Sequence, residues 1–232
     1  AYLKANFPLE FMTAVASSEI GHSSVGNADK ENKLVTYLDE AKAMGIAVLP
    51  PDIQKSEAKF SIEEPNAIRF GLVAVKNVGE GAVDSILQAR EAGPITNLDD
   101  LCARVDLHAA NKKVFESLIK AGALDSLEKG GSPAEIRSKL LTKLDDTMSR
   151  QSRVREDVSR GQGLLFGAMP VLEEQALSAE SNQPAAAFSE GEVLKAEKEV
   201  LGFYFSGHPL LNVQHKLKSV ATHEITQLNA EI

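Results

Sequence analysis

The spacing of apolar residues predicts helices along the first part of the chain. Over residues 1–20 the apolar positions recur at helical spacing and are interrupted at Pro8, so two short helices are expected. A small, polar stretch at 22–29 indicates a loop. An amphipathic pattern over residues 34–44 then predicts a third helix, which should end at Gly45.

The pattern changes after this helix. Residues 46–49 are a short apolar run ahead of Pro50, and we expect them to be extended, because a residue before proline is pushed away from the helical region. Apolar residues are nearly continuous over 67–75 and are followed by Lys-Asn-Val-Gly-Glu-Gly at 76–81. A clear helical pattern then covers 82–89, so two glycines one residue apart interrupt an otherwise apolar stretch.

Capping signals predict three more helices. Thr96 and Asp99 are spaced as a capping box for a helix that carries several apolar residues. Asn111 should open another helix, for which Gly122 supplies the expected C-terminal glycine. The sequence Ser-Pro-Ala-Glu at 132–135 combines an N-cap serine, a first-turn proline and a glutamate that completes a capping box, ahead of a long amphipathic helix.

Beyond Arg150 the chain is polar and charged, apart from an isolated apolar cluster at 164–166. The stretch 168–190 is rich in Ala, Ser, Glu, Gln and Pro, which predicts a flexible linker. A last helix is expected around residues 193–201, with Gly-His-Pro at 207–209 closing it.

Composition and charge narrow the function classes. With 43% hydrophobic residues the chain can bury a core, and it lacks both a membrane-length apolar run and a signal-peptide pattern, so we expect a cytoplasmic protein without a membrane partner. The single cysteine, Cys102, is predicted to be a core residue, and the five histidines show no metal-ligand spacing. The formal net charge of -8 argues against nucleic-acid binding, unless basic residues gather at one site or the chain is a fragment of a larger protein. A start at Ala1 without an initiator methionine favours a fragment.

The turn at Val78-Gly79-Glu80-Gly81 is the most informative feature. We expect it to lie between two short helices, with glycines that adopt positive φ and leave backbone N–H groups exposed. A second helix beginning at Gly81 would direct its unpaired amides and positive dipole end toward a phosphate, with Lys76 beside the turn. A dinucleotide-binding turn fits poorly, because its fingerprint places a third glycine where this chain has Asp84. A plain helix connection is the alternative for an isolated Gly-x-Gly.

Several motifs together carry a family resemblance. They are Ile-Arg-Phe-Gly-Leu at 68–72, Val-Gly-Glu-Gly-Ala at 78–82 and Leu-Ile-Lys-Ala-Gly-Ala-Leu-Asp at 118–125. These residues resemble the tandem helix-hairpin-helix region of the bacterial DNA polymerase III alpha subunit. Tyr-Leu-Lys-Ala at 2–5 and Leu-Pro-Pro-Asp at 49–52 look like the end of that family's fingers domain, and residues 199–210 look like the segment leading into its OB-fold.

The resemblance implies a mainly α fold, a tandem helix-hairpin-helix with flanking helices and a flexible linker. It implies four parts: the C-terminal end of the fingers domain at 1–60, the tandem helix-hairpin-helix DNA-binding and clamp-binding domain at 61–160, a clamp-binding peptide and linker at 161–190, and a helix with the lead-in to the OB-fold at 191–232. The expected partners are duplex primer-template DNA, the sliding clamp and other replicase subunits.

The resemblance implies that the first hairpin grips duplex DNA. The residues expected to bind DNA lie at this hairpin and near the start of the last helix of the second unit: Lys76, Val78, Gly79, Glu80, Gly81, Lys112 and Lys113. Contacts to phosphate fix position and carry no sequence information, as a processive polymerase requires. Glu80 is not a residue type expected at a phosphate-binding hairpin, because a carboxylate beside a phosphate is repelled unless the side chain points away.

The peptide Gln162-Gly163-Leu164-Leu165-Phe166 is similar to the bacterial clamp-binding pentapeptide and falls where the family carries its internal copy. Leu165 and Phe166 would anchor in a pocket of the clamp, and Gln162 would hydrogen-bond at its rim. From composition alone, this cluster could instead pack on the preceding helix.

We expect no catalytic residue and no metal or cofactor in this segment. Nucleotidyl transfer needs closely spaced carboxylates that hold two metal ions, which would be magnesium in the parent polymerase. No Asp-x-Asp occurs, and the adjacent pairs Asp99-Asp100 and Asp145-Asp146 are predicted to be caps or solvated surface. The rival hypothesis, motivated by the net charge, is an acidic helical scaffold that binds the clamp and never meets DNA.

Overall fold

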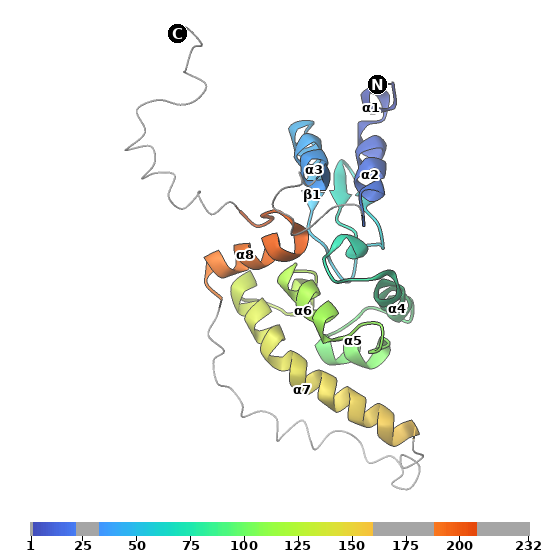
Figure 1. Cartoon of the computed structure of the whole chain (residues 1–232), viewed down its shortest axis with the longest axis vertical. Helices are drawn as coiled ribbons and strands as arrows, with labels where there is room; N and C mark the ends of the chain where they lie inside the picture. The colour runs from blue at the N-terminus through green and yellow to red at the C-terminus, as the bar shows by residue number, and fades with distance from the viewer. Residues whose placement is uncertain (1, 22–32, 160–187, 208–232) are drawn as a thin grey trace, which may run out of the picture.

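The structure is a computed structural model that describes residues 2–21, 33–159 and 188–207 (Figure 1). Helices dominate it, and the predicted mainly α class is confirmed. The loop predicted at 22–29 and nearly all of the linker predicted at 168–190 lie outside the described residues. In chain order the elements are α1 (Tyr2–Asn6), α2 (Pro8–Ser18), α3 (Lys33–Ala43), β1 (Ala47–Leu49), β2 (Ser61–Glu63), β3 (Ala67–Arg69), the 3-10 turn η1 (Leu72–Ala74), α4 (Glu80–Glu91), α5 (Leu98–Arg104), α6 (Lys112–Lys120), the 3-10 turn η2 (Asp125–Leu127), α7 (Pro133–Ser159) and α8 (Glu190–Leu201).

A small sheet joins the first helices to the rest of the chain. Its strand order is β1-β3-β2, with β1 parallel to β3 and β2 antiparallel to β3. All three residues of the central strand β3 are buried, as expected for the middle of a sheet covered on both faces. The extended segment predicted at 46–49 is β1, whereas β2 and β3 were not foreseen, because three-residue strands are too short to show a period.

One continuous hydrophobic core runs from Met12 to Phe203. Phe70, directly after β3, meets Phe60 edge-on at 4.8 Å between ring centroids and lies 6.0 Å from Phe203, which follows α8. The backbone N–H of Lys76 donates to the carbonyl of Val200 at 2.9 Å, so the end of α8 is tied to the residues leading into α4. The core therefore continues across residue 60, which is the predicted boundary between the first two parts of the chain. The four-part domain division remains a prediction.

The long helix α7 lies along α5 and α6 (Figure 1). Arg150 pairs with Asp99 at 2.8 Å, and Arg155 donates to the carbonyls of Cys102, Ala103 and Val105 at 2.9, 3.0 and 2.6 Å. These carbonyls belong to the last turn of α5, where a helix leaves its acceptors unpaired and favours a positive charge. The predicted core position of Cys102 is confirmed, and burial raises the pKa of its thiol to about 12.

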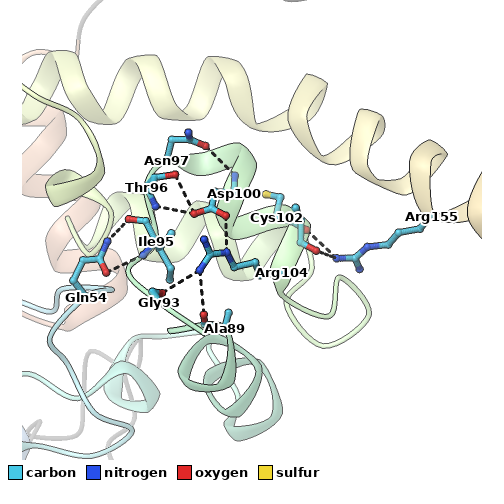
Figure 2. A network of polar contacts seen from close by, with 11 residues as sticks. Gln54, Ala89, Gly93, Ile95, Thr96, Asn97, Asp100, Cys102, Arg104 and Arg155 are labelled. Carbon is cyan, nitrogen blue, oxygen red and sulfur yellow. Dashed lines mark hydrogen bonds and ion pairs between the residues drawn. The ribbon is translucent and has the colours of Figure 1, made fainter. Parts of the chain in front are cut away.

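The capping box predicted from Thr96 and Asp99 is wrong by one residue. The N-cap of α5 is Asn97, whose side chain accepts from the Asp100 N–H at 2.9 Å (Figure 2). Asp100 in turn accepts from the Thr96 N–H at 2.8 Å and is paired with Arg104 one turn along the helix. Burial opposes ionisation of Asp100, but the hydrogen bonds from Thr96 and the Arg104 charge together lower the pKa of this carboxyl. Asp100, and not Asp99, therefore accepts the hydrogen bond from Thr96, and its pair with Arg104 stabilises this arrangement. Asp99 instead pairs with Arg150.

Other predicted helix ends are confirmed, with one correction. Asn111 and Ser132 cap α6 and α7 through their side chains, and Gly122 follows α6 with a positive φ of 79°. Helix α8, however, ends at Leu201 and is closed by Gly202, with φ 87°, and not by residues 207–209. A left-handed glycine directly after the helix lets the backbone turn so that its N–H donates to the last-turn carbonyl of Lys198. A Gly-His-Pro that begins five residues further along is not needed for this.

A buried charged network joins α6, α7, η2 and α8. Arg137 of α7 pairs with Asp125 at 3.0 Å and with Glu197 of α8 at 2.9 Å, and it donates to the carbonyl of Lys120 at 3.4 Å. Glu197, with 1% of its side chain exposed, also accepts from the N–H groups of the two residues at 205 and 206, at 3.0 and 2.8 Å. The network thus fixes how the chain leaves α8 against the end of α6.

Replacing the buried carboxylate should test this network. E197Q should lower the free energy of unfolding by about 1–3 kcal/mol, because Arg137 then keeps Asp125 as its one counter-charge in this network and the new NH2 group can face the backbone donors at 205 and 206. The matched control is E199Q on the same helix, which loses only the exposed pair with Lys120 and should cost below about 1 kcal/mol. Urea unfolding of both variants measures the difference, and equal effects would contradict a structural role for the network.

Candidate functional site

The first hairpin leads from η1 into α4. Helix α4 begins at Glu80, with Gly79 as its N-cap residue in extended conformation (φ -91°, ψ 162°) and without a side-chain cap. The predicted start at Gly81 is therefore late by one residue. Of the two short helices expected to flank the turn, the first is only the three-residue 3-10 turn η1.

The prediction that the glycines adopt positive φ is wrong. The left-handed residue of this turn is Asn77, with φ 66°, while Gly79 and Gly81 have negative φ. Asparagine tolerates this region better than most residues. The Asn77 side chain donates to the hydroxyl of Ser117 on α6 at 3.0 Å, and Ser117 is buried. The second helical unit therefore holds the turn of the first.

Neither glycine of the hairpin is required by packing. A Cβ atom built on Gly79 would meet nothing within 4 Å, and one on Gly81 would first reach the Cβ of Ala109 at 4.0 Å. Gly71 differs, since its Cβ would lie 2.4 Å from the backbone carbonyl carbon of Lys59. Gly71 is thus a structural glycine, whereas the fold itself would accept alanine at Gly79 and Gly81.

The hairpin presents free backbone donors. Gly79, Glu80 and Gly81 are exposed, and within the described part of the chain no protein acceptor meets their N–H groups. The carbonyl of Gly79 already accepts from the next turn of α4, from Ala82 at 3.1 Å and Val83 at 3.2 Å. Three exposed amides without a protein acceptor therefore lie at the N-terminal, positive end of a twelve-residue helix.

The side chains predicted to bind DNA at the first hairpin differ in how far they are exposed to solvent. Val78 is 5% exposed and belongs to the core, so its side chain cannot reach a ligand. Glu80 is exposed in the first turn of α4, where a negative charge suits the helix dipole. Lys76 is half-buried and, with Asn77, lines a hollow of about 490 Å³ whose other wall comes from residues 19–21 and Leu34.

The second hairpin joins α5 to α6 and is held by side-chain contacts, one of them with α4 of the first unit. The side chain of Asn111 accepts from the Val114 N–H at 3.2 Å, at the start of α6. Asp106 accepts from the N–H of His108 at 2.9 Å, and its own N–H donates to the hydroxyl of Ser85 at 2.7 Å. The N–H groups of Asn111, Lys112 and Lys113 at the start of α6 are exposed and, like those of the first hairpin, meet no protein acceptor within the described residues.

The two lysines predicted near this hairpin lie at the first two positions of α6. The Lys112 ammonium is 2.6 Å from Asp145 of α7 and 3.8 Å from Glu116, and the hydrogen bond to Asp145 raises the pKa of Lys112. Lys113 is exposed, and within the described residues no partner is recorded for it. Gly81 faces Ala109, so the structure brings the two hairpins side by side.

The residues predicted to bind the clamp, Gln162, Leu165 and Phe166, lie outside the described residues. Within the described ranges, no group of three or more His, Cys, Asp and Glu side chains is placed to hold a metal ion. No helix there is long and apolar enough to cross a bilayer.

Comparison with known proteins agrees with this geometry. A family model described as a helix-hairpin-helix motif matches residues 45–132, which include both hairpins. The chain therefore contains a helix-hairpin-helix region. Over 228 residues it is 37% identical to DNA polymerase III subunit alpha of Pasteurella multocida (strain Pm70), and over 230 residues it is 39% identical to the subunit of Thermus aquaticus.

These alignments cover 98% and 99% of this chain but only 18% and 17% of the two relatives. The subunit of Deinococcus radiodurans is similar to the same degree, with 37% identity over 235 residues. The chain is a relative of a segment of the DNA polymerase III alpha subunit, and the family resemblance drawn from its motifs is confirmed. It spans less than a fifth of the length of these curated relatives.

The different roles of the glycines can be separated by stability measurements. G81A should raise the free energy of unfolding by up to about 1 kcal/mol, because alanine is the better helix former and meets no obstacle. G71A should lower it by about 1–3 kcal/mol, because the new methyl group meets backbone that cannot move aside. Thermal or urea unfolding gives both values, and a marked loss of stability in G81A would mean that this glycine serves the fold.

Proposed function

We propose that this chain is the segment of a bacterial replicative polymerase that holds duplex primer-template DNA behind the site of synthesis, in the cytoplasm. The observation that carries the proposal is the set of three exposed, unpaired amides of Gly79, Glu80 and Gly81 at the start of α4. Similarity to DNA polymerase III alpha subunits and the helix-hairpin-helix match support duplex DNA as the ligand.

The chemistry of these amides suits a phosphate of the DNA backbone. A helix N-terminus offers N–H donors and a positive dipole end to the same anion. Glycine at both positions lets the sugar-phosphate chain approach the backbone closely, and neither glycine has another reason in the fold. Because every nucleotide carries the same phosphate, this grip is independent of sequence.

This mode of binding removes much of the objection raised by the net charge of -8. Backbone N–H groups bind phosphate without adding lysine or arginine, so few cations are needed at the contact. Lys76 stands beside the turn, and Lys113 lies at the start of α6 near the second hairpin. The rest of the parent protein, of which this chain spans less than a fifth in the relatives, would add its own contacts.

For the parent we propose a DNA-directed DNA polymerase that uses magnesium, with its catalytic carboxylates outside this segment. Three of the four aspartates in the two adjacent Asp pairs are engaged in ion pairs. Asp99 pairs with Arg150, Asp100 with Arg104 and Asp145 with Lys112. A carboxylate neutralised by a cation and turned to a helix surface does not present the shared, open oxygens that two metal ions need.

We also propose that Gln162, Leu165 and Phe166 bind the sliding clamp, alongside the other replicase subunits. The support is the pattern of a polar residue followed by two apolar anchors, in a stretch with few other apolar residues. A peptide tethered to a DNA-bound hairpin meets the clamp at high effective concentration, which would raise processivity.

The DNA grip is tested by replacing both hairpin glycines. G79A/G81A should weaken binding to a primer-template duplex by about tenfold or more, because methyl groups separate the amides from the phosphate by more than a hydrogen bond allows. Fluorescence anisotropy at several salt concentrations measures the affinity, and unfolding of the same variant shows that the fold is intact. Unchanged affinity in a folded double variant would rule out this hairpin as the contact.

The peptide is tested separately. L165A/F166A should abolish clamp binding, measured by surface plasmon resonance, while duplex affinity stays the same, since the anchors and the hairpin act on different partners. The matched control is V171A, an apolar truncation outside the pentapeptide, which should leave clamp binding unchanged. Clamp binding with no duplex binding at any salt concentration would favour the acidic scaffold instead.

A further inference from the structure

The two hairpins lie side by side but differ in their side chains. The first has exposed N–H groups and no side-chain cap at Gly79. At the second, Asn111 caps α6, and Asp106 closes the turn through the His108 N–H. The second hairpin carries, in addition, Lys112 and Lys113 at the first two positions of α6, so a phosphate there would meet ammonium groups as well as backbone.

One of these lysines is engaged by a carboxylate from another helix. Both oxygens of Asp145 lie within reach of the Lys112 ammonium, at 2.6 and 2.8 Å, and Glu116 adds a second carboxylate at 3.8 Å. Asp145 is fixed in place by α7, because the preceding Leu144 and Leu140 are buried in the common core. The acceptor thus belongs to a packed helix and not to a loop.

We propose that Asp145 limits the affinity of the second hairpin for duplex DNA by holding Lys112 away from phosphate. The proposal rests on the DNA-binding function given above and assigns to Asp145 a role in setting the strength of the grip. A phosphate must displace this carboxylate to gain Lys112, and the displaced carboxylate then repels the same phosphate. The effect is modest, because both partners are about half exposed or more and water screens them.

The neighbouring residue offers a matched control. Asp146 is also exposed on α7, and no contact to it is recorded in the described part of the chain. D145N and D146N change the net charge equally, so a general electrostatic effect moves both variants alike. A difference between them isolates the contact with Lys112.

The experiment is fluorescence anisotropy with a primer-template duplex over a range of salt concentrations. D145N should bind about two- to fivefold more tightly than D146N at low salt, the size expected for releasing an exposed ion pair. The slope of log affinity against log salt should steepen by about 0.9, which corresponds to one added phosphate contact. In a K112Q background the advantage of D145N over D146N should disappear.

Equal affinities of D145N and D146N would overturn the proposal, and so would an advantage that persists in K112Q. The failure of the proposed function looks different, because then the unaltered chain shows no salt-dependent duplex binding at all. If G79A/G81A weakens binding while D145N matches D146N, only the inference about Asp145 is lost. Thermal unfolding of each variant shows whether the fold is unchanged.

Discussion

The hairpin amides can remain free because the turn that precedes them is fixed from inside the protein. Unpaired backbone donors are tolerated at a surface where water or a ligand meets them, but a flexible turn would not hold three of them in one direction. Here Val78 is buried, Asn77 bonds to Ser117 of α6, and the Lys76 N–H bonds to the end of α8. The proposed phosphate contact depends on these internal restraints.

Further contacts connect the helices that follow the hairpin to one another. Helix α7 holds the last turn of α5 through Arg155, and Arg137 joins α7 to η2 and α8. The buried carboxylate of Glu197 then orients the residues that follow α8.

Much of this arrangement could be predicted from the sequence, because its signals are local. Proline at Pro8 separates two helices, and Asn111 and Ser132 cap helices where their side chains predict it. The errors arose where pairing between side chains or between strands decides among alternatives that the apolar pattern leaves open. Arg104 pairs with Asp100 and not with Asp99, and the three-residue strands β2 and β3 are stabilised by their pairing in the sheet with each other and, for β3, with β1.

At the first hairpin, one part of the sequence prediction is confirmed and another part is wrong. Its exposure and free amides agree with the sequence prediction, but the expected reason for the glycines does not, since the left-handed residue is Asn77. The role of Asp145 had no sequence signal, because it lies 33 residues from Lys112. Glycines that the fold does not require are the stronger argument for an external ligand, because neither backbone conformation nor packing explains them.

The most direct test of the DNA grip is to follow the backbone amides by nuclear magnetic resonance while a short duplex is added. The account predicts that the ¹H–¹⁵N signals of Gly79, Glu80 and Gly81 shift together at low salt and return as salt rises, while that of Gly122 stays fixed. Shifts confined to other parts of the chain, with these three signals unmoved by DNA, would contradict it.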